Sequence, residues 1–395
     1  MIGETGLKPI NLGKTRTLKD IEAAIRKICD SQGERFLIQA DMLSARHGAM
    51  HDAARLQLIV TLARQQLQSD YLDFNPQADA QALLYNLANC SPGIAALRLS
   101  KGIRLGEQTL NRREVFQESV ERMQAMDAGR YEDVVNGRVV DLICVAGSKV
   151  QHLRPLFSAE GKVKPASEMT TEMRRLIDFV NKQSGRTSVP DSLLESLGLL
   201  CSELVSNTQE HATSDHLGHP YFAHVEGVMV GWKRLEDEIF AEDFDGSEDL
   251  RRYWQRESST TDNNKTSLRA LHISFFDSGP GFASRFSGRA VHEMSLQEER
   301  GYLLKCLQPR QSSKTLDAAG IGLPAILNEL RKVGGLIRIR SGRLCIYNQF
   351  EENDQHRHPD DFRDWDTTDL APVAGAVVTI MIPLRGMQWS VSING

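Results

Sequence analysis

The segment 199–211 places a carboxylate and a carboxamide four residues apart within an apolar pattern. Read as a helix, it brings Glu203 and Asn207 one turn apart on one face, because side chains at i and i+4 stack on a 3.6-residue period. Leu200 and Leu204 fall on another face, which an amphipathic helix would bury. A carboxamide oxygen can ligate Mg²⁺, and a carboxylate one turn away can orient or deprotonate a water molecule. The pair therefore indicates a metal–nucleotide site, with an ordinary solvated helix face as the alternative.

A second group of candidate residues directly follows an apolar strand expected over 268–276. The strand runs into Asp277, and the turn after it lacks side chains at Gly279 and Gly281. A carboxylate in this place can accept the exocyclic amino hydrogen of an adenine, and the glycines let a ring lie against the backbone. A plain strand-to-loop turn capped by aspartate is the alternative interpretation.

A third group opens a later helix, with the sequence Gly320, Ile321, Gly322 and Leu323. Glycines at a helix start let backbone N–H groups approach phosphates, and the helix N-terminus adds favourable partial charge. A helix is expected over 324–333, because proline suits its first turn and a glycine pair its end. This segment predicts a phosphate-binding element.

The elements that must position these residues follow from periodicity. The C-terminal part predicts helices at 169–182 and 324–333 around the central helix, and strands at 222–232, 268–276, 336–340, 343–350 and 376–383. The N-terminal part predicts helices at 15–30, 51–66, 78–89 and 110–126, and strands at 35–40, 71–74 and 139–146. This alternation predicts an N-terminal α/β accessory or partner-binding region over 1–153, in which we find no catalytic constellation.

Two segments between these elements are expected to be loops. Residues 154–168 are polar and contain two prolines and a glycine, which indicates a linker or surface loop. Residues 351–374 form a long stretch rich in Asp, His and Trp, which we interpret as an exposed acidic loop.

The composition indicates an ordinary globular protein with a large core. Of its 395 residues, 41% are hydrophobic and 25% charged, and the net charge of −5 gives no reason to expect duplex nucleic acid as an obligate partner. The six cysteines are scattered, without a Cys-x-x-Cys pair, which favours reduced thiols. No segment resembles a signal peptide or approaches the length of a membrane span, so we expect a cytoplasmic protein.

The three groups of candidates resemble the sequence boxes of the GHKL ATP-binding superfamily. These boxes are Glu-x-x-x-Asn on a helix, Asp-x-Gly-x-Gly after a strand and Gly-x-Gly-Leu opening a later helix. The superfamily includes type II topoisomerase ATPase domains, the chaperone Hsp90, the mismatch-repair protein MutL, histidine kinases and anti-sigma serine kinases. Order and spacing match over 169–390, and three boxes in order are a strong signal where one would be weak.

The resemblance implies a Bergerat-type α/β sandwich, in which helices cover one face of a mixed, mostly antiparallel sheet. It implies that Asn207 ligates Mg²⁺, that Asp277 binds adenine and that Gly279 and Gly281 let the base pack. Residues 282–319 would form a lid.

The resemblance also assigns the phosphate end of the site. Gly320, Ile321, Gly322 and Leu323 would surround the phosphates, and Glu203 would act as general base. Lys314 or Arg310 of the lid would neutralise the γ-phosphate, unless they are solvated lid charges. Gly375-Ala376 stands where many members have Gly-Thr, so a threonine contact to the adenine pocket is not carried over.

The function that the resemblance implies is Mg²⁺-dependent binding and hydrolysis of ATP, with a nucleotide state that switches the lid and association with a protein partner or a second copy. No His-Glu-Leu-Arg-Thr-Pro-like segment precedes residue 168, which disfavours histidine autokinase activity. Two alternatives stay open. One is a serine/threonine kinase of the anti-sigma type, suggested by Ser202–Ala212. The other is a non-hydrolysing ATP-gated interaction module, as in bacterial stress signalling or phage defence.

Overall fold

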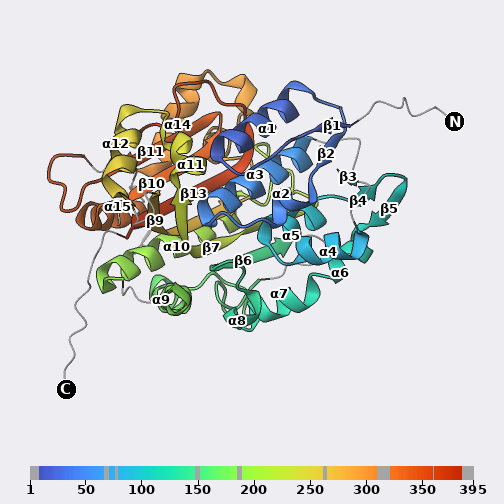
Figure 1. Ribbon diagram of the computed structural model, residues 1–395, viewed down its shortest axis with the longest axis horizontal. Coiled ribbons are helices and arrows are strands. Elements are labelled where there is room, and N and C mark those ends of the chain that lie inside the picture. Colours follow the sequence, from blue (N-terminus) through green and yellow to red (C-terminus); the bar gives the residue numbers. More distant parts are fainter. Residues whose placement is uncertain are drawn as a thin grey trace.

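The computed structural model describes residues 9–65, 71–75, 79–146, 152–184, 189–260, 265–308, 321–358 and 360–384. Its strands form a small sheet and a large sheet (Figure 1). The small sheet has the order β1-β2-β3-β4-β5, with parallel pairing from β1 to β4 and antiparallel pairing of β4 with β5. Its strands are β1 (Ile10–Asn11), β2 (Phe36–Ile38), β3 (Tyr71–Phe74), β4 (Gly102–Leu105) and β5 (Gln108–Asn111).

The large sheet has the order β12-β11-β10-β13-β9-β7-β6, and β8 pairs with β9. Its strands are β6 (Val139–Ala146), β7 (His224–Glu236), β8 (Ser258–Thr260), β9 (Thr266–Asp277), β10 (Leu336–Gly342), β11 (Leu344–Gln349), β12 (Arg363–Asp364) and β13 (Val373–Pro383). The described pairings of this sheet are all antiparallel. The mixed α/β fold class is therefore confirmed, but the parallel pairings lie in the small sheet and not, as predicted, in the large one.

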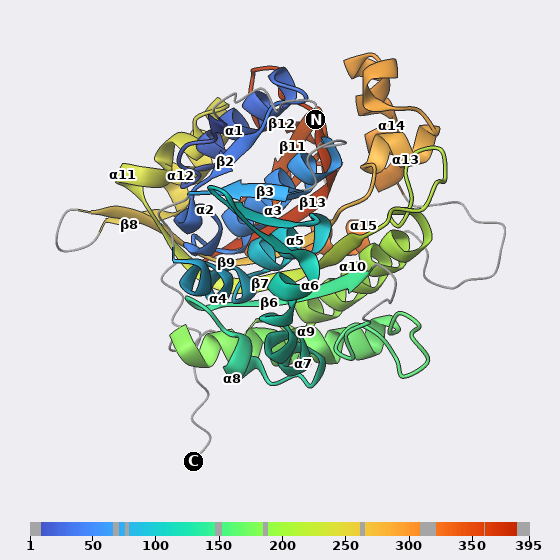
Figure 2. The ribbon, with the colours of Figure 1, turned by 90° about the vertical axis from the view of Figure 1, so that its right-hand side faces the viewer.

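Both faces of the large sheet are covered by helices, whereas the prediction placed helices on one face. Successive side chains of a strand point to opposite faces. On β7, Trp232 donates to Asn181 of α9 (Ala166–Ser184), and the next residue, Lys233, donates to the carbonyl of Arg46 over 3.3 Å. Helices α9, α10 (Asp191–His211) and α15 (Gly322–Val333) lie on one face, and α3 (Ala49–Gln65) lies on the other (Figure 2).

Helix α10 is the central helix that the sequence predicts. Its apolar side chains recur at helical spacing and are buried, namely Leu193, Leu197, Leu200, Cys201 and Val205. This stripe faces α9 and the sheet, which leaves Glu203 and Asn207 partly exposed on another face. The predicted separation of an apolar face from a chemical face is therefore confirmed for Leu193, Leu197 and Leu200, but not for Leu204, which is partly exposed and lines a cavity with Asn207.

Helix α3 is buried on every side from Ala49 to Leu62. It packs on β13 and β9 of the large sheet, while α1 (Leu18–Asp30) and α5 (Ser91–Leu99) pack against its other sides. Because no face meets solvent, its sequence lacks the polar stripe of a surface helix. The N-terminal region is thus a layer of the same core and not a separate body.

Strand β6 contradicts its predicted place in the N-terminal region. It pairs along its whole length with β7, from Val139 opposite Gly231 to Ala146 opposite His224. The assignment of this strand to an N-terminal α/β unit is therefore wrong, because its partner lies far along the chain. The predicted linker over 154–168 is ordered, since Leu156 and Phe157 are buried and α9 begins at Ala166.

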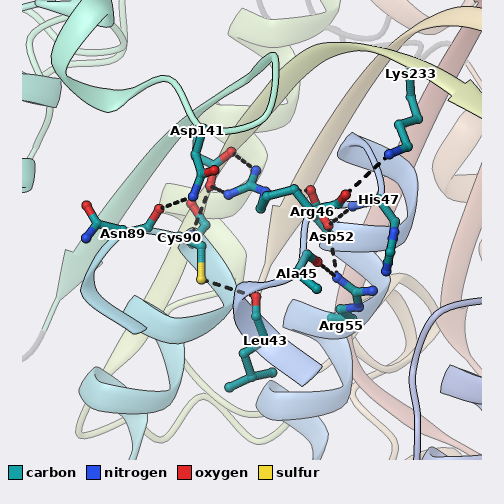
Figure 3. Close-up of polar contacts among 12 residues, drawn as sticks. Leu43, Ala45, Arg46, His47, Asp52, Arg55, Asn89, Cys90, Asp141 and Lys233 are labelled. Carbon is teal, nitrogen blue, oxygen red and sulfur yellow. Dashed lines mark hydrogen bonds and ion pairs between the residues drawn. The ribbon is translucent and has the colours of Figure 1, made fainter. Parts of the chain in front are cut away.

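A buried polar cluster joins β6 to α3 (Figure 3). Arg46 donates to Asp141 of β6 and to Asp52 of α3, each over 2.8 Å, and Arg55 donates to Asp52 over 3.3 Å. Burial alone would raise the pKa of Asp141, but the guanidinium of Arg46 lowers it. Burial raises the pKa of the neighbouring Cys90 thiol to about 11. Its charges are paired and its thiol is inert, so this cluster has a structural role.

The remaining helices complete the covering layers. In the N-terminal region they are α2 (Ala40–Ser44), α4 (Ala80–Ala88), α6 (Arg112–Gln117), α7 (Val120–Asp127) and α8 (Tyr131–Val134). The helix predicted at 110–126 is therefore two helices. The charged stretch after β7 forms α11 (Asp237–Phe240), a 3₁₀ turn at Ala241–Phe244 and α12 (Glu248–Glu257). Within the described ranges, no helix combines the length and apolar character of a membrane span.

The predicted lid is described from residue 282 to residue 308. It contains α13 (Phe282–Ser287) and α14 (Leu296–Leu307). Buried Glu299 of α14 accepts hydrogen bonds from the backbone N–H and the Nε of Arg343, both over 2.7 Å. This ion pair fastens α14 to the β10–β11 hairpin.

Candidate functional site

One cavity brings two of the predicted site residues together. It is enclosed by α10, α13 and the strands β7, β9 and β13, and its polar lining residues are Asn207, Thr208, Glu226, Asp277 and Arg285. Its apolar walls include Leu204, Phe275, Phe282, Ala376 and Val378. Its free volume is about 20 Å³, which is about the space that one water molecule needs. We call it the α10–β9 cavity.

Asn207 is placed in this cavity by α10. Its backbone carbonyl accepts a hydrogen bond from Nη1 of Arg285 over 3.1 Å. Its carboxamide forms no hydrogen bond with any described residue. The carboxamide oxygen is therefore available as a ligand.

Asp277 ends β9 and is buried against the cavity, with 6% of its surface exposed. Its Oδ1 accepts the backbone N–H of Gly279 over 2.8 Å, and its Oδ2 lies 3.7 Å from Nη2 of Arg285. Burial raises the pKa of Asp277, and the charge of Arg285 counteracts that rise. A buried carboxylate on an apolar cavity is a hydrogen-bond acceptor of the kind that an exocyclic amine requires.

Gly279 and Gly281 are required by the backbone of the turn after Asp277. A Cβ atom at Gly279 would lie 2.6 Å from the Cβ of Ala212, just beyond α10. Gly281 has φ +86°, and a Cβ there would lie 2.7 Å from Oγ of Ser341. The two glycines thus allow the turn to pack between the end of α10 and β10.

Glu203 contacts the start of α15, one turn of α10 before Asn207. Its Oε1 accepts the backbone N–H groups of Ile321 over 2.8 Å and Gly322 over 3.0 Å. A Cβ at Gly322 would lie 2.8 Å from Oε2 of Glu203 and 2.9 Å from the Cα of Leu200, so a side chain here would force α15 and α10 apart. The carboxylate therefore stands at the helix N-terminus where phosphates were predicted.

The other predicted phosphate-end residues divide into two groups. Ile321 is 46% exposed beside Glu203, and Leu323 follows inside α15 and packs against the core. Lys314, Arg310 and Gly320 lie outside the described residues.

Glu226 of β7 is a site residue that the sequence prediction missed. It lies opposite Asp277 on the neighbouring strand, and 2% of its surface is exposed. Its Oε1 accepts from the carboxamide of Gln209, and its Oε2 has no hydrogen-bond partner. Burial and then the charge of Asp277 raise the pKa of Glu226 to about 8. A single carboxylate inside an otherwise apolar strand was the signal that could have revealed it.

Two arginines were also missed. Arg285 of α13 contacts both Asp277 and the backbone of Asn207. Arg64 of α3 approaches from the opposite face of the sheet, donating to the carbonyls of Ser278 over 2.9 Å and Ala223 over 3.0 Å. No local sequence pattern marks either residue, because their partners are remote along the chain.

The arrangement suits a nucleotide base better than a metal centre built by the protein alone. Apolar walls and a buried acceptor suit a purine, and one carboxamide suits a Mg²⁺ ion whose other ligands are phosphate oxygens and water. The described residues contain no group of three or more His, Cys, Asp or Glu side chains that could hold a metal by themselves. The carboxamide of Asn207 thus fits the predicted role of a Mg²⁺ ligand.

Comparisons with protein-family models, with curated proteins and with solved structures find no significant match.

Proposed function

We propose that the chain is a Mg²⁺-dependent, ATP-binding and ATP-hydrolysing protein of the GHKL type. One observation carries this proposal: Asn207 and Asp277 line the same partly apolar cavity, although they lie on different elements. Glu203, one turn from Asn207, reaches the first amides of α15. Three groups thus lie beside one another at α10. They are Asp277 as the acceptor for a base, Asn207 as the ligand for a metal, and the N-terminus of α15 for phosphates.

Each residue has a part in this proposal. Asp277 accepts a hydrogen bond from the exocyclic amine of adenine, and apolar side chains such as Val378 enclose the ring. Asn207 holds Mg²⁺, which supplies charge neutralisation at the phosphates. Because the cavity admits only one water molecule, binding has to move α13, which carries Phe282 and Arg285 into it.

The position of Glu203 supports a second candidate function, the non-hydrolysing ATP-gated module. A general base must face the attacking water, but here Oε1 accepts two backbone hydrogen bonds. In a hydrolysing protein, phosphates replace this carboxylate at α15 and release it toward water. In a module that only binds ATP, Glu203 would remain a structural cap.

The N-terminal region is the proposed route from the nucleotide to a protein partner or a second copy. Arg64 contacts the turn after Asp277, and Thr61 accepts the backbone N–H of Ala374 over 3.1 Å, so α3 contacts both the turn after β9 and the start of β13. All six cysteines are free thiols, which supports the cytoplasm as the setting.

Turnover of γ-labelled ATP by the purified chain tests this proposal, with free phosphate and protein-bound phosphate measured separately. We expect the wild type to release free phosphate when Mg²⁺ is present. In Asn207→Ala, Mg²⁺ should no longer stimulate this release. Gln124→Ala, which removes an exposed helical carboxamide of α7, is the matched control. ATP binding without turnover favours the module. Transfer to an added protein favours a kinase, and neither binding nor turnover overturns the proposal.

A further inference from the structure

Arg285 of α13 faces the carboxylate oxygen that a base would need in the α10–β9 cavity. Of the two carboxylate oxygens of Asp277, Oδ1 already accepts the backbone N–H of Gly279 over 2.8 Å. The other oxygen, Oδ2, lies 3.7 Å from Nη2 of Arg285. A guanidinium and an exocyclic amine both present N–H donors, so Arg285 and a base would compete for the same oxygen.

A second contact holds the side chain of Arg285 in this place. Its Nη1 donates to the backbone carbonyl of Asn207 over 3.1 Å, which joins α13 to α10. The side chain of Arg285 is 12% exposed and that of Asp277 is 8% exposed, so water and salt screen their attraction only weakly. Arg285 and Phe282 both line the cavity, whose free volume of about 20 Å³ is far too small for a purine. In this state the protein itself fills the proposed base site.

The charges around Asp277 favour this contact but do not depend on it alone. The residues that line the cavity include two carboxylates, Asp277 and Glu226, and one cation, Arg285. Burial raises the pKa of Asp277, and the charges of Arg285 and, more weakly, of Arg64 lower it. Arg64 binds the carbonyl of Ser278 from the opposite face of the sheet. Asp277 therefore keeps a nearby cation when Arg285 leaves.

The helix that carries Arg285 is short and has a glycine at each end. Helix α13 contains six residues, and it lies between Gly281, with φ +86°, and Gly288, with φ +67°. Glycine adopts such left-handed backbone and its alternatives at little cost, so the chain can change direction at both positions. These glycines allow α13 to move as a unit.

Helix α14, by contrast, is fastened to the body of the molecule. Arg300 of α14 donates to the carbonyl of Phe362 over 2.9 Å and pairs with Asp364. Phe362 and Trp365 are buried, which corrects the prediction that 351–374 is an exposed loop throughout. We therefore expect opening of the base site to displace α13 more than α14.

We propose, on the basis of the proposed function, that Arg285 is an autoinhibitory residue, which occupies the place of the base until a nucleotide displaces it. The base replaces the guanidinium at Oδ2 of Asp277, and α13 withdraws Arg285 and Phe282 from the cavity. The apparent affinity is lower than that of the open site, by the fraction of molecules in which Arg285 has left. The polar contacts of the guanidinium are to Asp277 and the backbone of Asn207, so the competition acts at the base end of the site.

Isothermal titration of the full chain with adenosine, and with ATP in the presence of Mg²⁺, tests this proposal. Arg285→Ala should bind both ligands about tenfold more tightly than the wild type, because the contacts of Arg285 no longer have to be broken. The factor should be the same for both ligands, because adenosine and ATP share the base.

Two further variants support the comparison. Arg285→Gln keeps a long side chain and a donor for the carbonyl of Asn207 but has no charge for Asp277. It should tighten binding by a smaller factor, and it keeps the test valid if Arg285→Ala does not fold. Arg289→Ala is the matched control, because Arg289 belongs to the same lid but pairs with Glu298 outside the cavity. Its affinities should equal those of the wild type.

Three results would overturn the role of Arg285 and leave the proposed function intact. They are ATP binding that neither Arg285 variant tightens, weaker binding of ATP with unchanged binding of adenosine, and equal tightening in Arg289→Ala. Binding that appears only in the Arg285 variants would support autoinhibition. Absence of binding of either ligand in the wild type and in every variant would overturn the proposed function, and the role of Arg285 with it.

Discussion

Glu203 is the residue on which the proposed chemistry depends most. Its carboxylate caps α15 through two amides, and the proposed reaction needs the same carboxylate on a water molecule. Phosphates at the N-terminus of α15 would take over the amides of Ile321 and Gly322, so in this proposal ATP binding separates Glu203 from them. Glutamine can still accept the two hydrogen bonds but cannot accept a proton, whereas alanine can do neither.

Comparing Glu203→Gln with Glu203→Ala distinguishes the role of Glu203 as a cap of α15 from its proposed role as general base. Both variants should bind ATP and lose about 100-fold or more in turnover, because a positioned general base contributes at least this much. Only alanine should lower the free energy of unfolding, by about 1 kcal/mol for a lost helix cap. Steady-state turnover and urea denaturation check these results. Unchanged turnover in Glu203→Gln would leave Glu203 as a structural cap only.

Glu226 makes stability depend on pH in a predictable direction. Its pKa is raised from 4.5 to about 8 in the folded chain, so the folded state keeps a proton that the unfolded state loses. Wild-type stability therefore falls as pH rises from 4.5 to 8, relative to Glu226→Gln, which resembles the protonated form. The difference should reach about 3 kcal/mol at pH 7, since one pKa unit is worth about 1.4 kcal/mol. Urea denaturation at several pH values measures it, and a difference that does not change with pH would contradict this account.

At the level of elements, α3 forms hydrogen bonds with two segments that flank the α10–β9 cavity, the turn after β9 and the start of β13. Arg64 binds the carbonyl of Ser278, and Gln57 donates to the carbonyl of Gly375 over 3.4 Å. The turn after Asp277 and the start of β13 are joined by a hydrogen bond of 2.7 Å from Gly375 to Gly279. A helix of the N-terminal region therefore positions the predicted base-binding turn without lining the cavity.

Arg64→Gln should weaken ATP binding by about tenfold while the fold is kept, because two charge-assisted hydrogen bonds to the turn are lost. Arg98→Gln is the matched control, since Arg98 also donates to a backbone carbonyl, that of Ala146, away from the cavity. Fluorescence titration with a labelled ATP analogue measures both variants. Equal ATP affinities in the two variants would show that Arg64 does not position the turn.

The sequence predicted those elements whose signal is local. The leucine period of α10 and the apolar run of β9 sufficed to place Asn207 and Asp277. The sheet that β6 joins could not be predicted, because its partner β7 is remote along the chain. Arg64 was missed for the same reason, since it contacts the turn from an element that is distant in sequence. Glu226 has a local signal, a single carboxylate in an apolar strand, but its neighbour Asp277 is again remote along the chain.

On the scale of the whole molecule, the chain has one continuous core that crosses the predicted boundary at residue 153. The α3 helix covers β9 and β13, and β6 forms the edge of the large sheet. Removal of either element would expose an apolar sheet face or a strand edge. The proposed nucleotide site and the N-terminal region therefore share one folding unit.

A fragment that begins at residue 152 should fail to fold, because it lacks α3 and β6. A fragment that begins at residue 136 restores β6 but still lacks α3, and we expect it to fail as well. The loss should exceed the 5–15 kcal/mol that stabilises a typical domain. Circular dichroism and thermal melting of both fragments check this expectation. A cooperative melting transition in the shorter fragment would show that the chain from residue 152 onward folds alone.

Equilibrium binding of ATP to the purified chain, with Mg²⁺ and beside GTP, tests the central claim most directly. The account predicts saturable binding of ATP that exceeds GTP binding and is lost in Asp277→Asn, which replaces one acceptor oxygen by a donor. Asp354→Asn, in a surface loop outside the cavity, should bind as the wild type does. Absence of ATP binding, or ATP binding that survives Asp277→Asn unchanged, would contradict the α10–β9 cavity as a nucleotide site.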